Sequence, residues 1–592
     1  MEHLVTEAKK QVILMKGIGV SAGIVIGRVY VLERGVVEPA QFCYVDPGQT
    51  DAEIERLKAA FKESREQLSR IRKKMEDDRL GKEHIRIIDA HLMILKDNMI
   101  INDTVKVIKK ERVGAEWALH TVLKELMDYF AKIDDVYLRE RSSDVEHIVN
   151  RVMVNLTGSK HESVTDLKSP AIVVAHDLTP ADTAQMVKGM VLGFLTDVGG
   201  RTSHTAIMAR SIEIPAVVGL ENVTRRAETG DVVIIDGSTG TVIINPSESV
   251  TDVYRKRKEK YEAYGRTLLH YKDLPCETTD GRRIRLMGNL EITEELDALM
   301  EHGVEGIGLY RTEFLYLNRK DMPTEAEQLK AYSKVVKTMA GRPVVIRTLD
   351  VGADKVIPLH DSARENNPAM GLRAIRYSLK NPDIFKTQLR AALRASALGK
   401  VKIMFPMISG IEELRQAKGA LEDAKAELRS EGKAFDESIE VGAMIEVPSA
   451  AVIADLIVKE VDFISIGTND LLQYSLAIDR VNEHVAYLYE PFHPAVLRMI
   501  KTVAEAANKA GISVGVCGEM AGEPAYAYIL AGFGVDQLSM NAFSVLRVKR
   551  FLRGASYEEA RKLCKAITGF ATATEVEGYL NTALPELYRE EF

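Results

Sequence analysis

The chain has few cysteines, no P-loop motif and no dinucleotide-binding fingerprint. The absence of any Gly-x-x-x-x-Gly-Lys-Ser/Thr stretch excludes P-loop enzymes. The glycines between Lys16 and Leu32 do not form Gly-x-Gly-x-x-Gly ahead of a long helix, which disfavours dinucleotide binding. Only four cysteines occur in 592 residues, without a Cys-x-x-Cys pair, and this argues against a zinc site or a disulfide framework: Cys43, Cys276, Cys517 and Cys564.

The chain also lacks a surplus of positive charge and a long apolar segment near its start. A net charge of -7 gives no general attraction to nucleic acid or to an anionic membrane. Residues 1–17 place charged side chains around a short apolar run at 12–15, which is neither a signal peptide nor a membrane span. A globular composition and a length too great for one core predict a cytoplasmic protein of two to four domains, without nucleic-acid binding or membrane insertion.

The most informative stretch is Gly-Gly-Arg-Thr-Ser-His-Thr-Ala-Ile-Met-Ala-Arg at 199–210. The apolar run 190–195 predicts a strand, the two glycines a tight turn and 205–210 a helix, so His204 is expected near the helix start. A helix N-terminus attracts anions through its unpaired N–H groups and its dipole. The pattern therefore favours an imidazole that carries a phosphoryl group, although a helix-capping or solvent-exposed histidine is the simpler alternative.

The patterns around this stretch predict three successive parts. Short β segments flank a helical region that begins near Asp51, so we expect a discontinuous β/α domain at 1–35 and 157–247 with a helical-bundle insert at 36–156. A charged connecting helix follows within 248–275. From residue 276 to 592, strands and amphipathic helices alternate as in a (β/α)8 (TIM) barrel. The eight expected strands are 284–289, 306–310, 344–348, 402–406, 441–446, 463–467, 513–517 and 537–540.

Active sites of such barrels lie at the carboxyl ends of the strands, where this chain has a set of polar residues. Arg311 and Arg347 follow the second and third strands, and Arg480 lies just beyond the sixth; guanidinium groups suit carboxylate and phosphate. Glu446 and Asp470 are hard oxygen ligands after neighbouring strands, which with substrate oxygens and water describe a Mg2+ site. Structural ion pairs are the alternative. Asn469 and Cys517 complete the set.

These segments resemble the ordered motifs of enzyme I of the bacterial sugar phosphotransferase system, the phosphoenolpyruvate-protein phosphotransferases. The resemblance covers nearly the whole chain. It rests on the His204 stretch with Ile-Pro-Ala-Val-Val-Gly after it, and on Leu-Tyr-Arg-Thr-Glu-Phe-Leu at 309–315, Ile-Arg-Thr-Leu-Asp-Val-Gly at 346–352, Met-Ile-Glu-Val-Pro at 444–448, Ser-Ile-Gly-Thr-Asn-Asp-Leu at 465–471, Asp-Arg at 479–480 and Val-Cys-Gly-Glu at 516–519.

The resemblance implies a role for each matching residue. His204 would be phosphorylated, Cys517 would protonate the pyruvate enolate, and Mg2+ would bind Glu446 and Asp470. Phosphoenolpyruvate would be contacted by Arg311, Arg347, Asn469, Asp470 and Arg480. A His204-bearing domain that swivels between the barrel and the carrier protein HPr, docking of HPr on the helical insert and a homodimer through the barrel are further implications.

Three departures from the family pattern, Ala353, Asn366 and Leu372, affect only the shape of the loop after the third strand and substrate affinity. Phosphoenolpyruvate synthase and pyruvate phosphate dikinase share the His204 motif, but they need a large nucleotide-grasp domain for which this chain has no room. A non-catalytic regulator of the same fold is disfavoured because each expected catalytic group is present. Whether the phosphate serves sugar uptake or a regulatory relay stays open.

Overall fold

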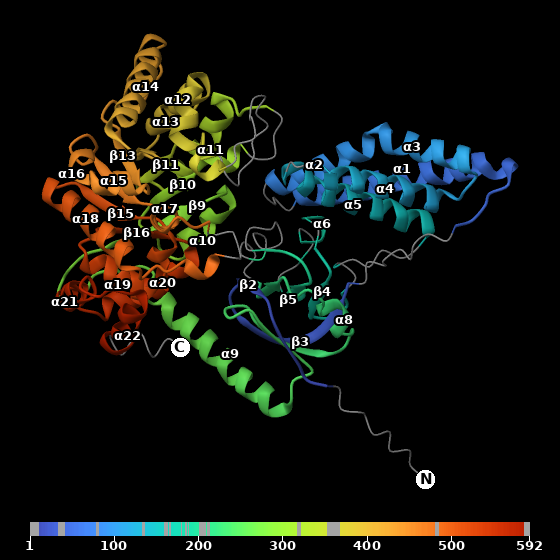
Figure 1. Ribbon diagram of the computed structural model, residues 1–592, viewed down its shortest axis with the longest axis horizontal. Helices are drawn as coiled ribbons and strands as arrows, with labels where there is room; N and C mark the ends of the chain where they lie inside the picture. Colours follow the sequence, from blue (N-terminus) through green and yellow to red (C-terminus); the bar gives the residue numbers. More distant parts are fainter. Residues whose placement is uncertain are drawn as a thin grey trace. The chain divides into compact units, whose positions relative to one another are not determined.

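A computed structural model of the 592-residue chain divides it into two compact units, Met1–Tyr264 and Gly265–Phe592 (Figure 1). The structure describes residues 11–32, 42–77, 82–132, 136–158, 164, 167–178, 180–183, 186, 189–200, 209, 214–316, 321–351, 367–479 and 485–584. No helix among these residues is long and apolar enough to cross a membrane.

The first unit contains the predicted helical insert. Its helices are α1 (Thr50–Asp77), α2 (Lys82–Lys96), α3 (Asn98–Glu111), α4 (Ala115–Lys132) and α5 (Val136–Thr157). Leu57 and Phe61 of α1 pack with Val149 and Val152 of α5 in one buried cluster, as the helical spacing of apolar residues predicted. Helix α3 begins at an Asp97 cap, whose side chain accepts a hydrogen bond from the N–H of Met99 at 2.9 Å.

The same unit contains one eight-stranded sheet, with the order β1-β8-β7-β3-β4-β5-β6-β2. The helical insert falls in sequence between β3 and β4, which are parallel neighbours, so the insert interrupts one continuous sheet. Two small helices, α6 (Pro180–Thr183) and α8 (Val223–Arg226), follow β4 and β6. The strands are β1 (Ile13–Lys16), β2 (Ile18–Ser21), β3 (Ile24–Val31), β4 (Ala171–Ala175), β5 (Val191–Thr196), β6 (Ala216–Val218), β7 (Val232–Asp236) and β8 (Thr241–Ile244).

Gly17 separates β1 from β2, although these strands lie at opposite ends of the sheet order. The sheet must therefore curl until its two edges meet. A Cβ atom at Gly17 would lie 2.7 Å from the carbonyl oxygen of Val218, and one at Gly19 would lie 2.1 Å from that of Gly237. Only glycine permits backbones to approach this closely.

The charged helix expected within 248–275 is α9 (Glu248–Leu269). Beyond it a closed, all-parallel barrel confirms the predicted fold class. Each of the eight expected strands matches an observed one, and every strand end agrees within one residue. They are β9 (Arg285–Leu290), β10 (Ile307–Arg311), β11 (Val344–Arg347), β12 (Val401–Phe405), β13 (Glu440–Ile445), β14 (Phe463–Ile466), β15 (Ser513–Val516) and β16 (Gln537–Met540).

Helices surround these strands, as Figure 1 shows, and the main core lies between the two layers. Val344 and Ile346 of β11, for example, pack outward in this core. The longer helices are α11 (Glu325–Thr338), α13 (Pro382–Ser396), α14 (Ile411–Ser430), α18 (Pro494–Ala510), α20 (Ala542–Arg553), α21 (Tyr557–Ile567) and α22 (Ala573–Ala583). The shorter ones are α10 (Leu296–Glu301), α12 (Ala374–Lys380), α15 (Pro448–Val452), α16 (Ala454–Ile457), α17 (Thr468–Leu476) and α19 (Pro524–Gly532).

Candidate active site at the carboxyl end of the barrel

A second buried cluster fills the inside of the barrel and gives the position of the site. It consists of Leu309, Val345, Met404, Met444, Phe463 and Cys517. Side chains alternate between the two faces of a strand, so the residue two places after an inward one also points inward. Arg311, Arg347 and Glu446 stand two places after Leu309, Val345 and Met444. The predicted groups therefore form the next inward layer, at the carboxyl ends of the strands.

Arg347 is held by two buried carboxylates. Its Nη2 lies 2.5 Å from Glu313 Oε1 and its Nη1 lies 2.9 Å from Asp350 Oδ2. The exposed fractions of the three side chains are 6%, 0% and 4%. Burial by itself lowers the pKa of Arg347, but the two carboxylates outweigh burial and the net pKa is raised. A charged guanidinium is thus locked in place at the barrel mouth.

Arg373, which precedes α12, connects this pair to Asp470. Its Nη2 lies 2.9 Å from Asp350 Oδ1, and its Nη1 lies 3.2 Å from Asp470 Oδ1 and 2.9 Å from the hydroxyl of Tyr474. Asp470 stands in the first turn of α17, beside Asn469. The amide oxygen of Asn469 accepts a hydrogen bond from the N–H of Glu519 at 3.0 Å, which leaves its Nδ2 group as the donor suited to an anion.

Glu446 is a buried carboxyl group in a crowded, negative environment. Its Oε1 accepts a hydrogen bond from the N–H of Met407 at 2.6 Å. A Cβ atom at Gly467 would lie 2.6 Å from its Oε2, so glycine is what lets this carboxyl lie against the end of β14. Burial, followed by the negative charges of Asp470 and Asp350, raises the pKa of Glu446 to about 8. A divalent cation would relieve that repulsion, so these groups fit a metal.

The described residues include no cluster of three or more His, Cys, Asp or Glu side chains that could hold a metal by themselves. Glu446 and Asp470 are two hard oxygen ligands, and a Mg2+ ion usually keeps several waters and binds through one or two carboxylates plus substrate phosphate. The donor set therefore suits an ion that arrives with its substrate rather than a closed structural metal centre.

Cys517 belongs to the interior cluster and has an exposed fraction of 3%. Its Sγ lies 3.8 Å from the carbonyl oxygen of Ile466, and its own carbonyl accepts a hydrogen bond from Asn289 Nδ2 at 3.1 Å. Burial raises the pKa of this thiol, so the group stays protonated at neutral pH. Cys276 and Cys564 are also buried, but in the outer core, so position rather than burial distinguishes Cys517.

Arg311 pairs with Glu291, a residue that sequence reasoning did not select. It also missed Glu313, Asp350 and Arg373. Glu291 directly follows β9, and Glu313 and Asp350 lie within three residues of strand ends. The rule that found Arg311 and Arg347, a polar side chain after a barrel strand, could have found these three. Arg373 follows no strand and offered no such signal.

Two predicted residues, His204 and Arg480, lie outside the described residues, as does most of the predicted helix 205–210. The described residues before His204 agree with the expected strand and turn: β5 ends at Thr196, and Gly199 has a φ of 121°, which favours glycine. At the same edge, after the parallel neighbour β4, His176 Nδ1 lies 3.0 Å from Asp197 Oδ2.

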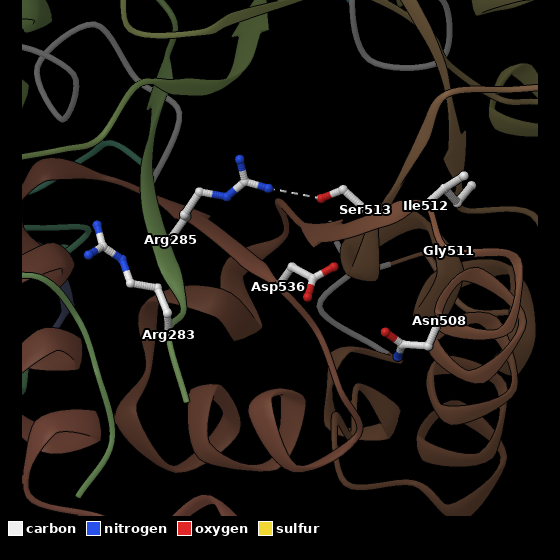
Figure 2. Close-up of a pocket in the computed structure, with 7 residues that line it drawn as sticks. All are labelled: Arg283, Arg285, Asn508, Gly511, Ile512, Ser513 and Asp536. Carbon is white, nitrogen blue, oxygen red and sulfur yellow. Dashed lines mark hydrogen bonds between the residues drawn. The ribbon is translucent and has the colours of Figure 1, made fainter. Parts of the chain in front are cut away.

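A cavity of about 510 Å³ lies at the opposite, amino end of the barrel strands (Figure 2). Arg285 begins β9 and donates from Nη2 to Ser513 Oγ at 3.2 Å, and Ser513 begins β15. The cavity is lined by Arg283, Arg285, Asn508, Gly511, Ile512, Ser513 and Asp536. None of the predicted site residues lines it.

Comparisons with known proteins give the family of the chain. Three family models match: the N-terminal domain of PEP-utilising enzymes at residues 16–141, their mobile domain at 167–240 and their PEP-binding domain at 266–557. A phosphoenolpyruvate-protein phosphotransferase of Staphylococcus carnosus (strain TM300) is 44% identical over 563 residues, 95% of this chain and 97% of the relative. The protein of that name from Haemophilus influenzae is 43% identical over 574 residues, 97% of this chain and 99% of the relative.

Among solved structures, an NMR structure titled Enzyme I (nEIt) is 41% identical. It covers 42% of this chain and 99% of its own, with a TM-score of 0.36.

Proposed function

The chain belongs to the phosphoenolpyruvate-protein phosphotransferase family, and from this premise we propose that it moves the phosphoryl group of phosphoenolpyruvate to His204 and then to a histidine of HPr. Pyruvate is the product of the first transfer. The two transfers together are the first step of a sugar phosphotransferase system. The observation that carries the proposal is the single inward layer of Arg311, Arg347 and Glu446 above Cys517.

The arginines bind the substrate in this proposal. Phosphoenolpyruvate carries a carboxylate and a phosphate, and guanidinium forks suit both groups. Arg347 has its guanidinium held by Glu313 and Asp350, so little reorganisation is needed when the substrate arrives. Asn469 supplies its Nδ2 donor, and Arg480 is assigned to the same role from the motif alone.

Glu446 and Asp470 would hold Mg2+, which when bound neutralises charge on the phosphoryl oxygens. The neutral imidazole of His204 attacks phosphorus in line; a P–N bond forms while the bond from phosphorus to the enol oxygen breaks. The resulting enolate takes a proton at its methylene carbon from the Cys517 thiol. The Cys517 thiolate then regains a proton from solvent, and pyruvate leaves.

The second half of the reaction needs HPr. We assign its docking site to the helical insert formed by α1 to α5 and the dimer contact to the barrel, both from the family resemblance. The domain that bears His204 would swivel between the barrel and the carrier, with α9 as the candidate hinge. Sedimentation of the full chain tests the dimer.

The test of the first transfer is labelling of the full chain with radioactive phosphoenolpyruvate and Mg2+. The site is then mapped at alkaline pH, which preserves the acid-labile P–N bond. His204→Ala should abolish the label. His176→Ala is the matched control, because His176 lies after β4 at the same sheet edge and should leave labelling unchanged. A stable label on His176 or on another histidine would overturn the assignment.

The carrier step is tested from the opposite direction. An Arg347→Gln chain should accept phosphate from phosphoenolpyruvate at least about 10²-fold more slowly but should still accept it from phosphorylated HPr, because only the first transfer uses the barrel. Failure with HPr in a folded variant would count against HPr as the partner.

A further inference from the structure

Glu291 and Arg311 form an ion pair at the carboxyl ends of β9 and β10. Glu291 Oε1 accepts a hydrogen bond from Arg311 Nη1. Their side chains have exposed fractions of 28% and 27%, so a dissolved ligand can reach both. Arg347, at 6%, is instead enclosed by two carboxylates that are themselves buried. The two inward arginines of this mouth are therefore held in different ways.

The backbone at Glu291 is anchored by hydrogen bonds, while its side chain is partly exposed. The N–H groups of Glu291 and Ile292 donate to Glu295 Oε2 at 2.9 and 3.4 Å. Among the described residues, the structure records no second cation paired with the Glu291 carboxylate. Movement of this carboxylate away from Arg311 requires a change of side-chain rotamer and no movement of the loop.

We propose that Glu291 is an internal competitor of the substrate: its carboxylate occupies Arg311 in the empty barrel, and an anionic group of phosphoenolpyruvate displaces it. This inference rests on the proposed function, in which Arg311 is a substrate ligand. A pair that is partly exposed is weak enough to exchange, whereas the enclosed Arg347 pairs are not.

The competitor has two consequences for binding. It weakens the affinity for phosphoenolpyruvate, because part of the binding free energy is used to break the ion pair. It also favours release, because Glu291 can return to Arg311 as the product leaves. Glu291 also lies close to another carboxyl group, that of Glu295. Burial is the main cause that raises the pKa of Glu295 to about 7, and the negative charge of Glu291 is the next.

The test measures binding of phosphoenolpyruvate to the full chain in the His204→Ala background, where no transfer occurs. Calorimetry with Mg2+ gives the dissociation constant directly. Glu291→Gln removes the competing charge and should lower the dissociation constant by about two- to fivefold, the range of a partly exposed ion pair. Glu294→Gln is the matched control, because this exposed carboxylate on the same turn contacts only Thr293 Oγ1, at 3.2 Å, among the described residues. It should change affinity less than about twofold.

Arg311→Gln separates this inference from the proposed function. If Arg311 binds substrate, this variant loses most of the affinity, and adding Glu291→Gln to it produces no gain. If Arg311→Gln leaves binding intact, the proposed ligand role of Arg311 fails. If Arg311→Gln weakens binding but Glu291→Gln alone leaves it unchanged or weaker, the ligand role stands and the competitor is overturned.

A kinetic measurement excludes a merely structural effect. In the His204-containing chain, Glu291→Gln should lower KM for phosphoenolpyruvate while kcat stays the same or falls, because release is no longer assisted. Thermal unfolding of each variant confirms that the barrel is folded. A rise in KM would show that Glu291 positions Arg311 for the substrate instead of competing with it.

Discussion

The two ends of the barrel both carry arginines, but in opposite electrostatic settings. At the amino end, among the described residues, each arginine has a polar partner that it does not share with another arginine: Arg282 lies 2.8 Å from Asp536, Arg283 lies 2.7 Å from Glu305, and Arg285 contacts the Ser513 hydroxyl. At the carboxyl end Arg347 and Arg373 share Asp350, and Arg373 also contacts Asp470. Simple pairing at one end contrasts with a shared, buried network at the other.

The two ends of the barrel differ in how well their charges are balanced. The amino end has a cavity of about 510 Å³, and its charges balance locally at partly exposed positions (Figure 2). At the carboxyl end, burial and the nearby negative charges raise the pKa of Glu446 to about 8. A fold tolerates such crowding where a cation and an anion are meant to bind. We therefore assign the proposed substrate site to the carboxyl end on the basis of charge crowding, and not to the cavity at the amino end.

The largest effect is expected for Arg347→Gln, which disrupts the buried network at the carboxyl end. It removes the cation paired with the buried Glu313, while Asp350 keeps Arg373, so we expect a loss of about 3–5 kcal/mol in the free energy of unfolding. Labelling by phosphoenolpyruvate should fall by about 10²–10³-fold or more. Denaturant unfolding and rapid-quench labelling measure the two effects. A variant as stable as the wild type would mean that the network does not hold this end together.

Cys517→Ala tests the chemistry of the inward layer. Transfer from phosphoenolpyruvate should slow by about 10²-fold, because only that step protonates carbon, while exchange between His204 and HPr should stay near the wild-type rate. Cys564→Ala is the control, since this thiol is equally buried but lies in the outer core. Equal slowing of both half-reactions would assign Cys517 a structural role.

The alternation of buried strands and amphipathic helices was sufficient to predict the barrel and its eight strands. Arg311, Arg347 and Glu446 were predicted because each follows a strand, and strand ends converge. Their partners were harder to predict. Asp350 is bound by Arg347 and by Arg373, which lie 26 residues apart in the chain, and such shared contacts depend on loop geometry that no periodic pattern encodes. Glu291 follows β9 and was overlooked because no substrate role suggested it.

Glu446→Gln tests the charge crowding at the carboxyl end through the pH dependence of stability. The pKa of Glu446 is raised in the folded state, so its contribution to stability is full below its ordinary pKa near 4.5 and is lost as pH rises through about 8. Without Mg2+, the glutamine variant should therefore melt about 2–6 °C higher than the wild type at pH 8, with no difference at pH 4.

Mg2+ should stabilise the wild type at pH 8 and have little effect on the Glu446→Gln variant, because the substitution removes one charged oxygen ligand. Calorimetry with chelator and with Mg2+ gives both comparisons. An equal Mg2+ shift in the two chains would place the ion elsewhere.

The smallest effect is expected at the amino end, for Arg285→Gln. Among the described residues, the Arg285 guanidinium makes its hydrogen bond to a hydroxyl, and the nearby Asp536 carboxylate already binds Arg282 and accepts a hydrogen bond from the N–H of Val514 at 3.1 Å. A glutamine can replace the bond to Ser513, so the free energy of unfolding should change by less than about 1 kcal/mol and labelling by less than about twofold. Both are measured beside Arg347→Gln under one set of conditions. If Arg285→Gln impaired labelling without lowering stability, the amino end would be coupled to the substrate site, and the division of the barrel into a structural end and a chemical end would fail.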